Sequence, residues 1–153
     1  MVDEPSSANH QAGVKVRDYM TPEPQTLGVE HSLLDAVLMV RRAGLRHIPI
    51  VDDGRLVGLI SDRDLARFTP SMLVPLSPDE YNRVFESTEI GKVMAKNPLT
   101  TSPGALLAEA VDLITANRLG CLPVLENGTL VGILTKADLI RALRDSLAAG
   151  NSI

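Results

Sequence analysis

The chain has 153 residues, a formal net charge of −4 and a hydrophobic content of 44%, but only 3% of its residues are aromatic. The acidic balance disfavours binding to a nucleic-acid backbone, and the scarcity of aromatic side chains removes the stacking surfaces that single strands need. A single cysteine excludes an intramolecular disulfide framework and a cysteine-based zinc site. No apolar run is long enough to cross a membrane, and the polar N-terminus lacks a signal peptide's apolar stretch. We therefore expect a soluble, cytoplasmic protein with no membrane or nucleic-acid partner.

The sequence contains two copies of one unit, offset by the 74 residues that separate Met20 from Met94. Residues 20–67 align with residues 94–141 without a gap, and 15 of the 48 positions are identical, where average composition gives roughly three. A unit of fewer than about 70 residues buries little apolar surface alone. The two copies are therefore expected to share one core.

The first copy begins with a short helical turn that ends at Met20, after residues 1–13, which are polar and expected to be loose. Prolines then force an extended path, because the residue before a proline is pushed out of the helical region. Ser32 is expected to cap the next helix, with Asp35 three residues on, and Gly44 is expected to end it.

Two apolar strands, Arg46–Val51 and Arg55–Ile60, flank Asp53-Gly54. Asp-Gly is a strong hairpin signal because both central residues need positive φ. Ser61 then opens a helix over Asp62–Phe68. The order predicted for each copy is strand, helix, strand, strand, helix.

Residues 69–87 connect the copies, and a short helix is expected from Ser77 to about Glu86. Its three apolar side chains either pack on the protein or form a partner surface: Tyr81, Val84 and Phe85.

The second copy follows the same plan, with Asn127-Gly128 in the hairpin. Because Leu106 replaces the cap at Ser32, its first helix is predicted to start earlier, near Ser102-Pro103. Its last helix, from Lys136 to about Leu147, carries an apolar stripe that could seal a dimer as well as a core. This stripe comprises Leu139, Ile140, Leu143 and Leu147, and the residues after it, 148–153, are expected to fray.

Each copy also contains the pattern Gly-x-x-Ser/Thr-x-x-Asp, at residues 58–64 and 132–138. A strand that ends where a helix begins leaves unpaired N–H groups and the positive end of the helix dipole, which suit an anion. Local sequence alone favours a plainer interpretation, a capping box. In that interpretation Asp64 and Asp138 accept from the cap N–H groups of Ser61 and Thr135.

The order and duplication of these features resemble the CBS (cystathionine-β-synthase-type) domain family, and the pair resembles a free-standing tandem CBS, or Bateman, module. The resemblance rests on residues 16–21 and 90–94, on the strands that contain Pro49 and Pro123, and on the two Gly-to-Asp patterns. It implies an α/β fold of two β-α-β-β-α repeats packed as a pseudo-twofold pair, and a homodimer. The expected boundaries are 14–68 for CBS domain 1, 69–87 for the linker, 88–147 for CBS domain 2, and 1–13 with 148–153 for flexible tails.

The resemblance further implies that Asp64 and Asp138 hold the ribose hydroxyls of an adenosine compound, while Ser61 and Thr135 contact the ribose or a phosphate. Basic residues before the second strand often reach the phosphates in relatives. Arg46 and His47 stand there in the first copy, but Gly120 and Cys121 stand there in the second. We therefore expect the first cleft to favour a phosphorylated ligand and the second to bind more weakly, or to take adenosine without strong phosphate contact. Arg63 or Lys136 could blur this difference. The full set of expected ligand-binding residues is Arg46, His47, Pro49, Gly58, Ser61, Arg63, Asp64, Cys121, Pro123, Gly132, Thr135, Lys136 and Asp138.

No nucleophile elbow, Walker loop, carboxylate pair or metal-ligand spacing is present, so we expect no catalysis, no metal and no required cofactor. The expected function is a sensor that binds AMP, ADP or ATP in clefts between the repeats and transmits its state to a separate, unidentified protein. S-adenosylmethionine and NADH stay open as ligands because the ribose contact is common to all of them. The alternative function is a ligand-free dimerisation or scaffold module.

Overall fold

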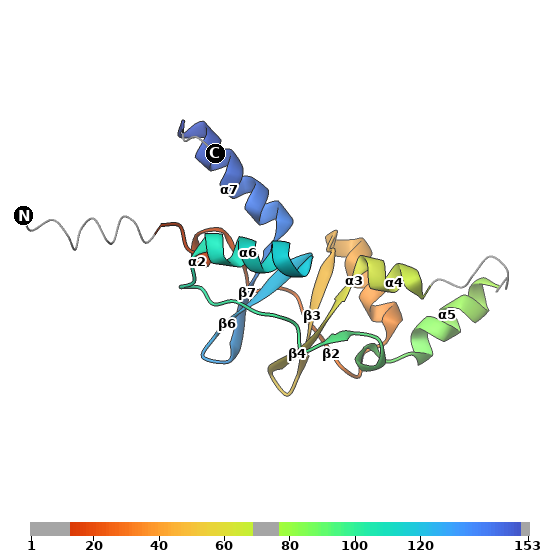
Figure 1. The fold of residues 1–153 in the computed structure, drawn as a ribbon. Helices are drawn as coiled ribbons and strands as arrows, with labels where there is room; N and C mark the ends of the chain where they lie inside the picture. Colours follow the sequence, from red (N-terminus) through yellow and green to blue (C-terminus); the bar gives the residue numbers. More distant parts are fainter. Residues whose placement is uncertain (1–12, 69–76, 151–153) are drawn as a thin grey trace, which may run out of the picture. The chain divides into compact units, whose positions relative to one another are not determined.

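The computed structural model describes residues 13–68 and 77–150, which form two compact units (Figure 1). The central unit is Pro24–Pro98, and the terminal unit combines Met1–Glu23 with Leu99–Ile153. The predictions for residues 1–12, 69–76 and 151–153 fall outside the described residues. The mixed α/β fold is confirmed.

The central unit is built on a four-stranded sheet in the order β2-β3-β4-β5. The strands are β2 (Leu27–Gly28), β3 (His47–Asp52), β4 (Arg55–Ser61) and β5 (Ala95–Lys96). β2 runs parallel to β3, and the other pairs are antiparallel. The helical elements are α3 (Leu33–Ala43), α4 (Asp62–Arg67), α5 (Pro78–Ser87) and the 3-10 turn η1 (Ile90–Lys92).

Local sequence signals determine where the elements of this unit begin and end. The Ser32 Oγ accepts a hydrogen bond from the Asp35 N–H at 3.2 Å, which confirms the predicted cap of α3. Gly44 ends α3 in the left-handed conformation, with φ 65°. Asp53 and Gly54 both adopt positive φ, at 52° and 78°, so the predicted hairpin turn is confirmed.

Helix α5 packs on the central unit through Phe85. The Ser77 Oγ accepts from the Glu80 N–H at 3.2 Å, and Pro78 occupies the first turn, as predicted. Phe85 is fully buried and its ring stacks on Tyr81, with 4.7 Å between the ring centroids. This helix therefore contributes to the core of the central unit. The buried residues of that core are Leu27, Leu33, Ala36, Ile48, Ile50, Ile60, Leu65, Phe85 and Ile90.

The terminal unit contains a three-stranded sheet in the order β1-β7-β6. Its elements are α2 (Val16–Tyr19), β1 (Thr21–Pro22), α6 (Leu107–Asn117), β6 (Cys121–Glu126), β7 (Thr129–Thr135) and α7 (Lys136–Ala148). Asn127 and Gly128 adopt positive φ between β6 and β7, as predicted. Within the described ranges, no helix combines the length and the apolar character that a membrane span needs.

In each compact unit, one edge strand comes from the other sequence repeat. The β1 strand of the first copy pairs with β7 of the second, with Thr21 opposite Ile133. The β5 strand of the second copy pairs with β4 of the first, with Ala95 opposite Leu59. Each unit thus combines the strands and helices of one copy with the leading strand of the other.

The predicted early start of the second copy's first helix is wrong. Helix α6 begins at Leu107, which is equivalent to Leu33, and Leu106 provides no side-chain cap. The Leu107 N–H instead donates to the Val14 carbonyl at 2.8 Å, and the segment before the helix pairs with the chain around α2. A side-chain cap is unnecessary because a distant backbone segment satisfies this terminal donor.

Candidate functional site

Asp64 lies in the first turn of α4, where β4 ends and the helix begins. Its N–H donates to the Ser61 Oγ at 3.1 Å, and its Oδ2 accepts from the Ser61 N–H at 2.9 Å. The capping box is therefore formed. It uses one carboxylate oxygen, Oδ2, and leaves Oδ1 without a hydrogen bond from a described residue.

The Oδ1 of Asp64 has one cationic neighbour within 4 Å among the described residues, Arg67. The Arg67 Nη1 lies 3.8 Å from Oδ1, beyond hydrogen-bond distance, and the Arg67 side chain is highly exposed. The Asp64 side chain itself is 27% exposed. A carboxylate in this state can accept two further O–H groups while it caps the helix, so capping and ligand binding are compatible.

Arg46 and His47 enter the central unit beside this helix start. The Arg46 carbonyl accepts from the Asp62 N–H at 3.0 Å, and His47 lies opposite Ser61 in the β3–β4 pair. The Arg46 side chain is exposed, and so is that of Arg63. Both cations belong to the segments that flank Asp64.

Asp138, the counterpart of Asp64, has the same cap but a much more occupied carboxylate. Its Oδ2 accepts from the Thr135 N–H at 2.9 Å. Its Oδ1 accepts from Arg141 Nη2 at 2.7 Å and from the Thr21 hydroxyl at 3.1 Å. The Asp138 side chain is only 5% exposed.

Arg141 is itself held in place by Tyr19. Its Nη2 donates to the Tyr19 carbonyl at 3.0 Å, and its guanidinium carbon lies 5.9 Å from the centre of the Tyr19 ring. The Tyr19 hydroxyl donates to Asp145 Oδ2 at 2.6 Å. This hydrogen bond raises the pKa of Tyr19 above its ordinary value, with smaller contributions from burial and from the charge of Asp145.

The comparison with known proteins decides the family. The sequence matches the CBS domain over residues 16–71 and again over residues 90–145. The chain belongs to the CBS domain family. The expected tandem pair of CBS repeats is thereby confirmed.

Individual CBS relatives cover most of this chain. A CBS domain-containing protein of Dictyostelium discoideum is 30% identical over 132 residues, which are 85% of this chain and 91% of the relative. An A-adding tRNA nucleotidyltransferase of Aquifex aeolicus is 33% identical over 135 residues, which are 88% of this chain but only 15% of that enzyme.

Solved CBS structures share the fold. The structure of a Vibrio cholerae protein assigned to acetoin utilization (AcuB) superposes with a TM-score of 0.73 at 33% identity, over 89% of this chain and 94% of that one. The structure of CBSX2 in complex with AMP superposes with a TM-score of 0.73 at 28% identity, over 87% of this chain and 98% of that one. A CBS-pair protein of the same name, from Arabidopsis thaliana, has a TM-score of 0.75 at 27% identity, over 92% of this chain and 99% of that one.

The remaining residues predicted for the CBS sites fall into a buried and an exposed group. Pro49 and Pro123 are fully buried on β3 and β6. Cys121 is buried opposite Thr135, and burial raises the pKa of its thiol to about 12. Lys136 is exposed in the first turn of α7.

The two strand glycines of the CBS pattern serve close packing. A Cβ on Gly58 would lie 2.8 Å from the Met94 Cγ, and one on Gly132 would lie 2.8 Å from the Met20 Sδ. Both distances are shorter than the contacts that a real Cβ atom makes. These glycines therefore let a methionine side chain lie against the strand that leads to each aspartate.

Sequence reasoning missed Thr21 and Arg141 as partners of Asp138. The alignment of the two copies contains part of the signal, because Thr21 is equivalent to Ala95 and Arg141 to Arg67. Thr21 has a hydroxyl that can donate to a carboxylate, and Ala95 has none. That the segment carrying Thr21 lies beside Asp138 rather than Asp64 follows from the strand exchange between copies.

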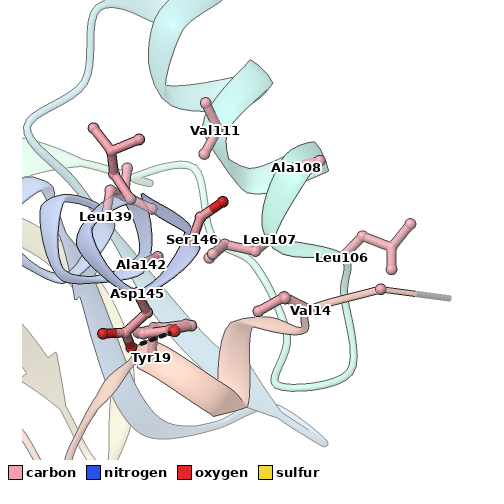
Figure 2. A pocket seen from close by; sticks show the side chains of 12 residues that line it. Val14, Tyr19, Leu106, Leu107, Ala108, Val111, Leu139, Ala142, Asp145 and Ser146 are labelled. Carbon is pink, nitrogen blue, oxygen red and sulfur yellow. Dashed lines mark hydrogen bonds between the residues drawn. The ribbon is translucent and has the colours of Figure 1, made fainter. Parts of the chain in front are cut away.

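A separate apolar groove of about 630 Å³ lies in the terminal unit (Figure 2). Residues of α6 and α7 line it together with Val14 and Tyr19, and none of the predicted CBS site residues does so. The Tyr19–Asp145 hydrogen bond forms part of its wall. Val111 and Leu143 line it with partly exposed side chains. The groove is thus an apolar surface distinct from the candidate sites at Asp64 and Asp138.

Proposed function

We propose that this protein is a regulatory module that binds an adenosine nucleotide of the AMP, ADP or ATP type through Asp64 and passes the bound state to a partner protein. The observation that carries the proposal is the availability of the Asp64 Oδ1. It sits on a carboxylate whose other oxygen is fixed by the Ser61 N–H. A carboxylate held in this way presents an oriented pair of lone pairs to the two hydroxyls of a ribose.

The complex of CBSX2 with AMP supports an adenosine ligand. That protein has the same fold over 87% of this chain. S-adenosylmethionine and NADH carry the same ribose diol and are the alternative ligands. A ligand regulates only if it binds two conformations with different affinity.

Charge favours a phosphorylated ligand near Asp64. Arg46 and Arg63 flank this aspartate with exposed cationic side chains, and His47 lies opposite Ser61 on β3. The corresponding positions in the other copy are Gly120, Cys121 and Ala137, none of which is cationic. The one exposed cation in the first turn of α7 is Lys136, at the position equivalent to Asp62. We therefore assign the phosphorylated compound to the Asp64 site and weaker phosphate contact to the Asp138 site.

The first test is thermal unfolding of the chain with AMP, ADP, ATP, NADH or S-adenosylmethionine. A ligand at 100 times its dissociation constant should stabilise the folded state by about 2.7 kcal/mol. For a chain of this size the melting temperature should rise by roughly 5–10 °C. AMP, ADP or ATP should give the largest shift.

Asp64→Asn is the decisive variant, because an amide oxygen can still accept from the Ser61 N–H while the negative charge is lost. Asp62→Asn removes the same charge from the same helical turn and serves as the matched control. The ligand-induced shift should shrink strongly in Asp64→Asn and persist in Asp62→Asn. Equal shifts in both variants, or no shift with any ligand in the unmodified chain, would contradict the proposal.

The second candidate function is dimerisation, and the apolar face of α7 favours it. Ile140, Leu143 and Leu147 follow one helical stripe and are 66%, 46% and 54% exposed. We propose a second copy of this chain as the occupant of this face, because a stripe repeated on each copy can bury itself against its own equivalent. Light scattering should give a dimer mass for the unmodified chain and a monomer mass for Leu143→Glu. Arg83→Glu introduces the same residue at an exposed position of α5, in the central unit, and is the control that should stay dimeric.

A further inference from the structure

The carboxylates of Asp64 and Asp138 differ in how much of their hydrogen-bonding capacity the protein itself uses. We name Thr21, Thr135, Asp138 and Arg141 the Asp138 cluster. In this cluster both oxygens of Asp138 accept from protein donors, and the side chain is 5% exposed. Asp64, in the central unit, differs: its Oδ2 accepts a hydrogen bond from a described residue, and its Oδ1 accepts none.

Two of the donors in the Asp138 cluster are hydroxyls, the type of donor that a ribose would bring. The Thr21 hydroxyl lies 3.1 Å from Oδ1 and 3.4 Å from Oδ2, and the Thr135 hydroxyl lies 3.1 Å from Oδ2. Arg141 adds a charge-assisted hydrogen bond of 2.7 Å to Oδ1. A ribose can reach this carboxylate only by displacing Thr21 and Arg141.

The register of the sheets makes Thr21 and Ala95 directly comparable. Thr21 lies opposite Ile133 on β7, and Ala95 lies opposite Leu59 on β4, which is the equivalent strand position. The methyl group of Ala95 has no proton to donate. The same backbone place thus holds a hydroxyl donor beside Asp138 and none beside Asp64.

Tyr19 accounts for the difference between the two arginines. Arg141 is held by the Tyr19 carbonyl and lies over its ring, whereas the residue equivalent to Tyr19 in the other copy is Val93. Arg67, equivalent to Arg141, stays 3.8 Å from Asp64 with a side chain that is 78% exposed. One arginine is therefore fixed on its aspartate, and the other is left in solvent.

We propose that Thr21, with Arg141, occupies the Asp138 carboxylate in place of a ligand, so that Thr21 determines the order in which the two sites fill. This inference rests on the proposed function. An adenosine compound binds at Asp64 first. It binds at Asp138 only at higher concentration, when the Thr21 hydroxyl and Arg141 have been displaced.

Displacement at Asp138 also has a structural consequence. Thr21 lies on β1, which comes from the first copy and completes the sheet of the second. A ligand that displaces the Thr21 hydroxyl from Asp138 breaks the side-chain hydrogen bond between β1 and the first turn of α7. Thr21 and Asp138 are 117 residues apart in the sequence. The second site is therefore suited to report high ligand concentration through a change at β1.

The test measures AMP binding by calorimetry in chains with one aspartate removed. In an Asp64→Ala background, only the Asp138 site is left, and Thr21→Val removes the hydroxyl while keeping the shape of the side chain. AMP affinity should rise about tenfold, because the ligand no longer competes with this donor. Thr21→Ser keeps the hydroxyl and should bind AMP like its parent.

The reciprocal test adds the hydroxyl to the other site. In an Asp138→Ala background, Ala95→Thr should weaken AMP binding at Asp64 by a similar factor. Ala95→Val has the same shape without the hydroxyl and should leave the affinity near that of its parent. This pair keeps the inference testable if Thr21→Val fails to fold.

A second readout separates this role from a purely structural one. Without ligand, Thr21→Val should lower the melting temperature, since a hydrogen bond to a charged group is lost. Affinity and stability should therefore change in opposite directions. A parallel loss of both, or unchanged AMP affinity, would overturn the inference. AMP binding by the Asp138→Ala parent, which keeps the Asp64 site, would show that the proposed function still stands. Absence of AMP binding in the unmodified chain would instead overturn the proposed function.

Discussion

The side chain of Met94 lies directly against the backbone of Gly58. A Cβ at residue 58 would sit 2.8 Å from the Met94 Cγ and 3.0 Å from the Ala95 carbonyl oxygen. The Gly58 backbone needs no positive φ, so the requirement at this position is space alone. This contact fixes β5 against the strand that leads to Asp64.

Gly58→Ala is therefore expected to destabilise the protein by about 1–3 kcal/mol, which urea unfolding would measure. The added methyl meets both a side chain and a backbone oxygen, and only the side chain can move. A second change, Met94→Ala, should restore part of the lost stability when it is combined with Gly58→Ala. If the double variant loses as much unfolding free energy as the two single variants together, the steric explanation is wrong.

The two aspartates should contribute unequally to stability without ligand. Asp138→Ala removes the acceptor for Thr21, Thr135 and Arg141 and should cost about 2–3 kcal/mol. Asp64→Ala removes little more than a helix cap and should cost about 1 kcal/mol. Urea unfolding of both variants under one condition gives the comparison. Equal losses would show that the Asp138 cluster adds no stability.

Tyr19 should ionise above its ordinary pKa of 10.0 because its hydroxyl donates to Asp145. The difference in absorbance at 295 nm between the unmodified chain and Tyr19→Phe isolates its titration. The midpoint should move back toward 10 in Asp145→Asn, which removes the charge that the phenol faces.

The sign of the pH effect on stability follows from this direction. A folded-state pKa above the unfolded value favours the protonated phenol in the folded state. Its contribution is fully present below pH 10 and is lost as the pH rises through the folded pKa. Tyr19→Phe should therefore show a weaker loss of stability above pH 10 than the unmodified chain. Identical pH profiles would contradict the assignment of the hydrogen bond.

Cys121 should be unreactive in the folded protein. Burial raises the pKa of its thiol from 9.0 to about 12, so the reactive thiolate is scarce at neutral pH. A disulfide reagent at pH 8 should label the chain slowly in buffer and rapidly in urea. Because the pKa is raised on folding, the stabilisation from the protonated thiol should be lost between pH 9 and pH 12. Rapid labelling of the folded chain would favour a redox role instead.

Local rules of sequence predicted most of the fold because the relevant interactions lie within a few residues. The caps at Ser32, Ser61 and Thr135 follow from a hydroxyl and a carboxylate three residues apart. The turns at Asp53-Gly54 and Asn127-Gly128 follow from the need for positive φ. None of these features depends on the rest of the chain.

The errors and omissions came from interactions between distant segments. The start of α6 was wrongly predicted because its first N–H is bound by Val14, 93 residues earlier in the sequence. The hydrogen bond from Thr21 to Asp138 was missed for the same reason, because 117 residues separate them in the sequence. The sequence predicted the same role for both aspartates and attributed the difference between the sites to Arg46 and His47. The packing of Tyr19 on Arg141 adds a difference at the carboxylates themselves.

The exchange of leading strands also determines when each unit can fold during synthesis. The central unit is continuous in sequence, from Pro24 to Pro98, so it can form as soon as that stretch has left the ribosome. The terminal unit needs β1 together with β7, and the 113 residues from Glu23 to Thr135 take roughly 6–23 seconds to make at about 5–20 residues per second. Throughout that interval Thr21 has no strand to pair with. The segment that completes the second sheet is therefore made before the central unit and finds its place only after it.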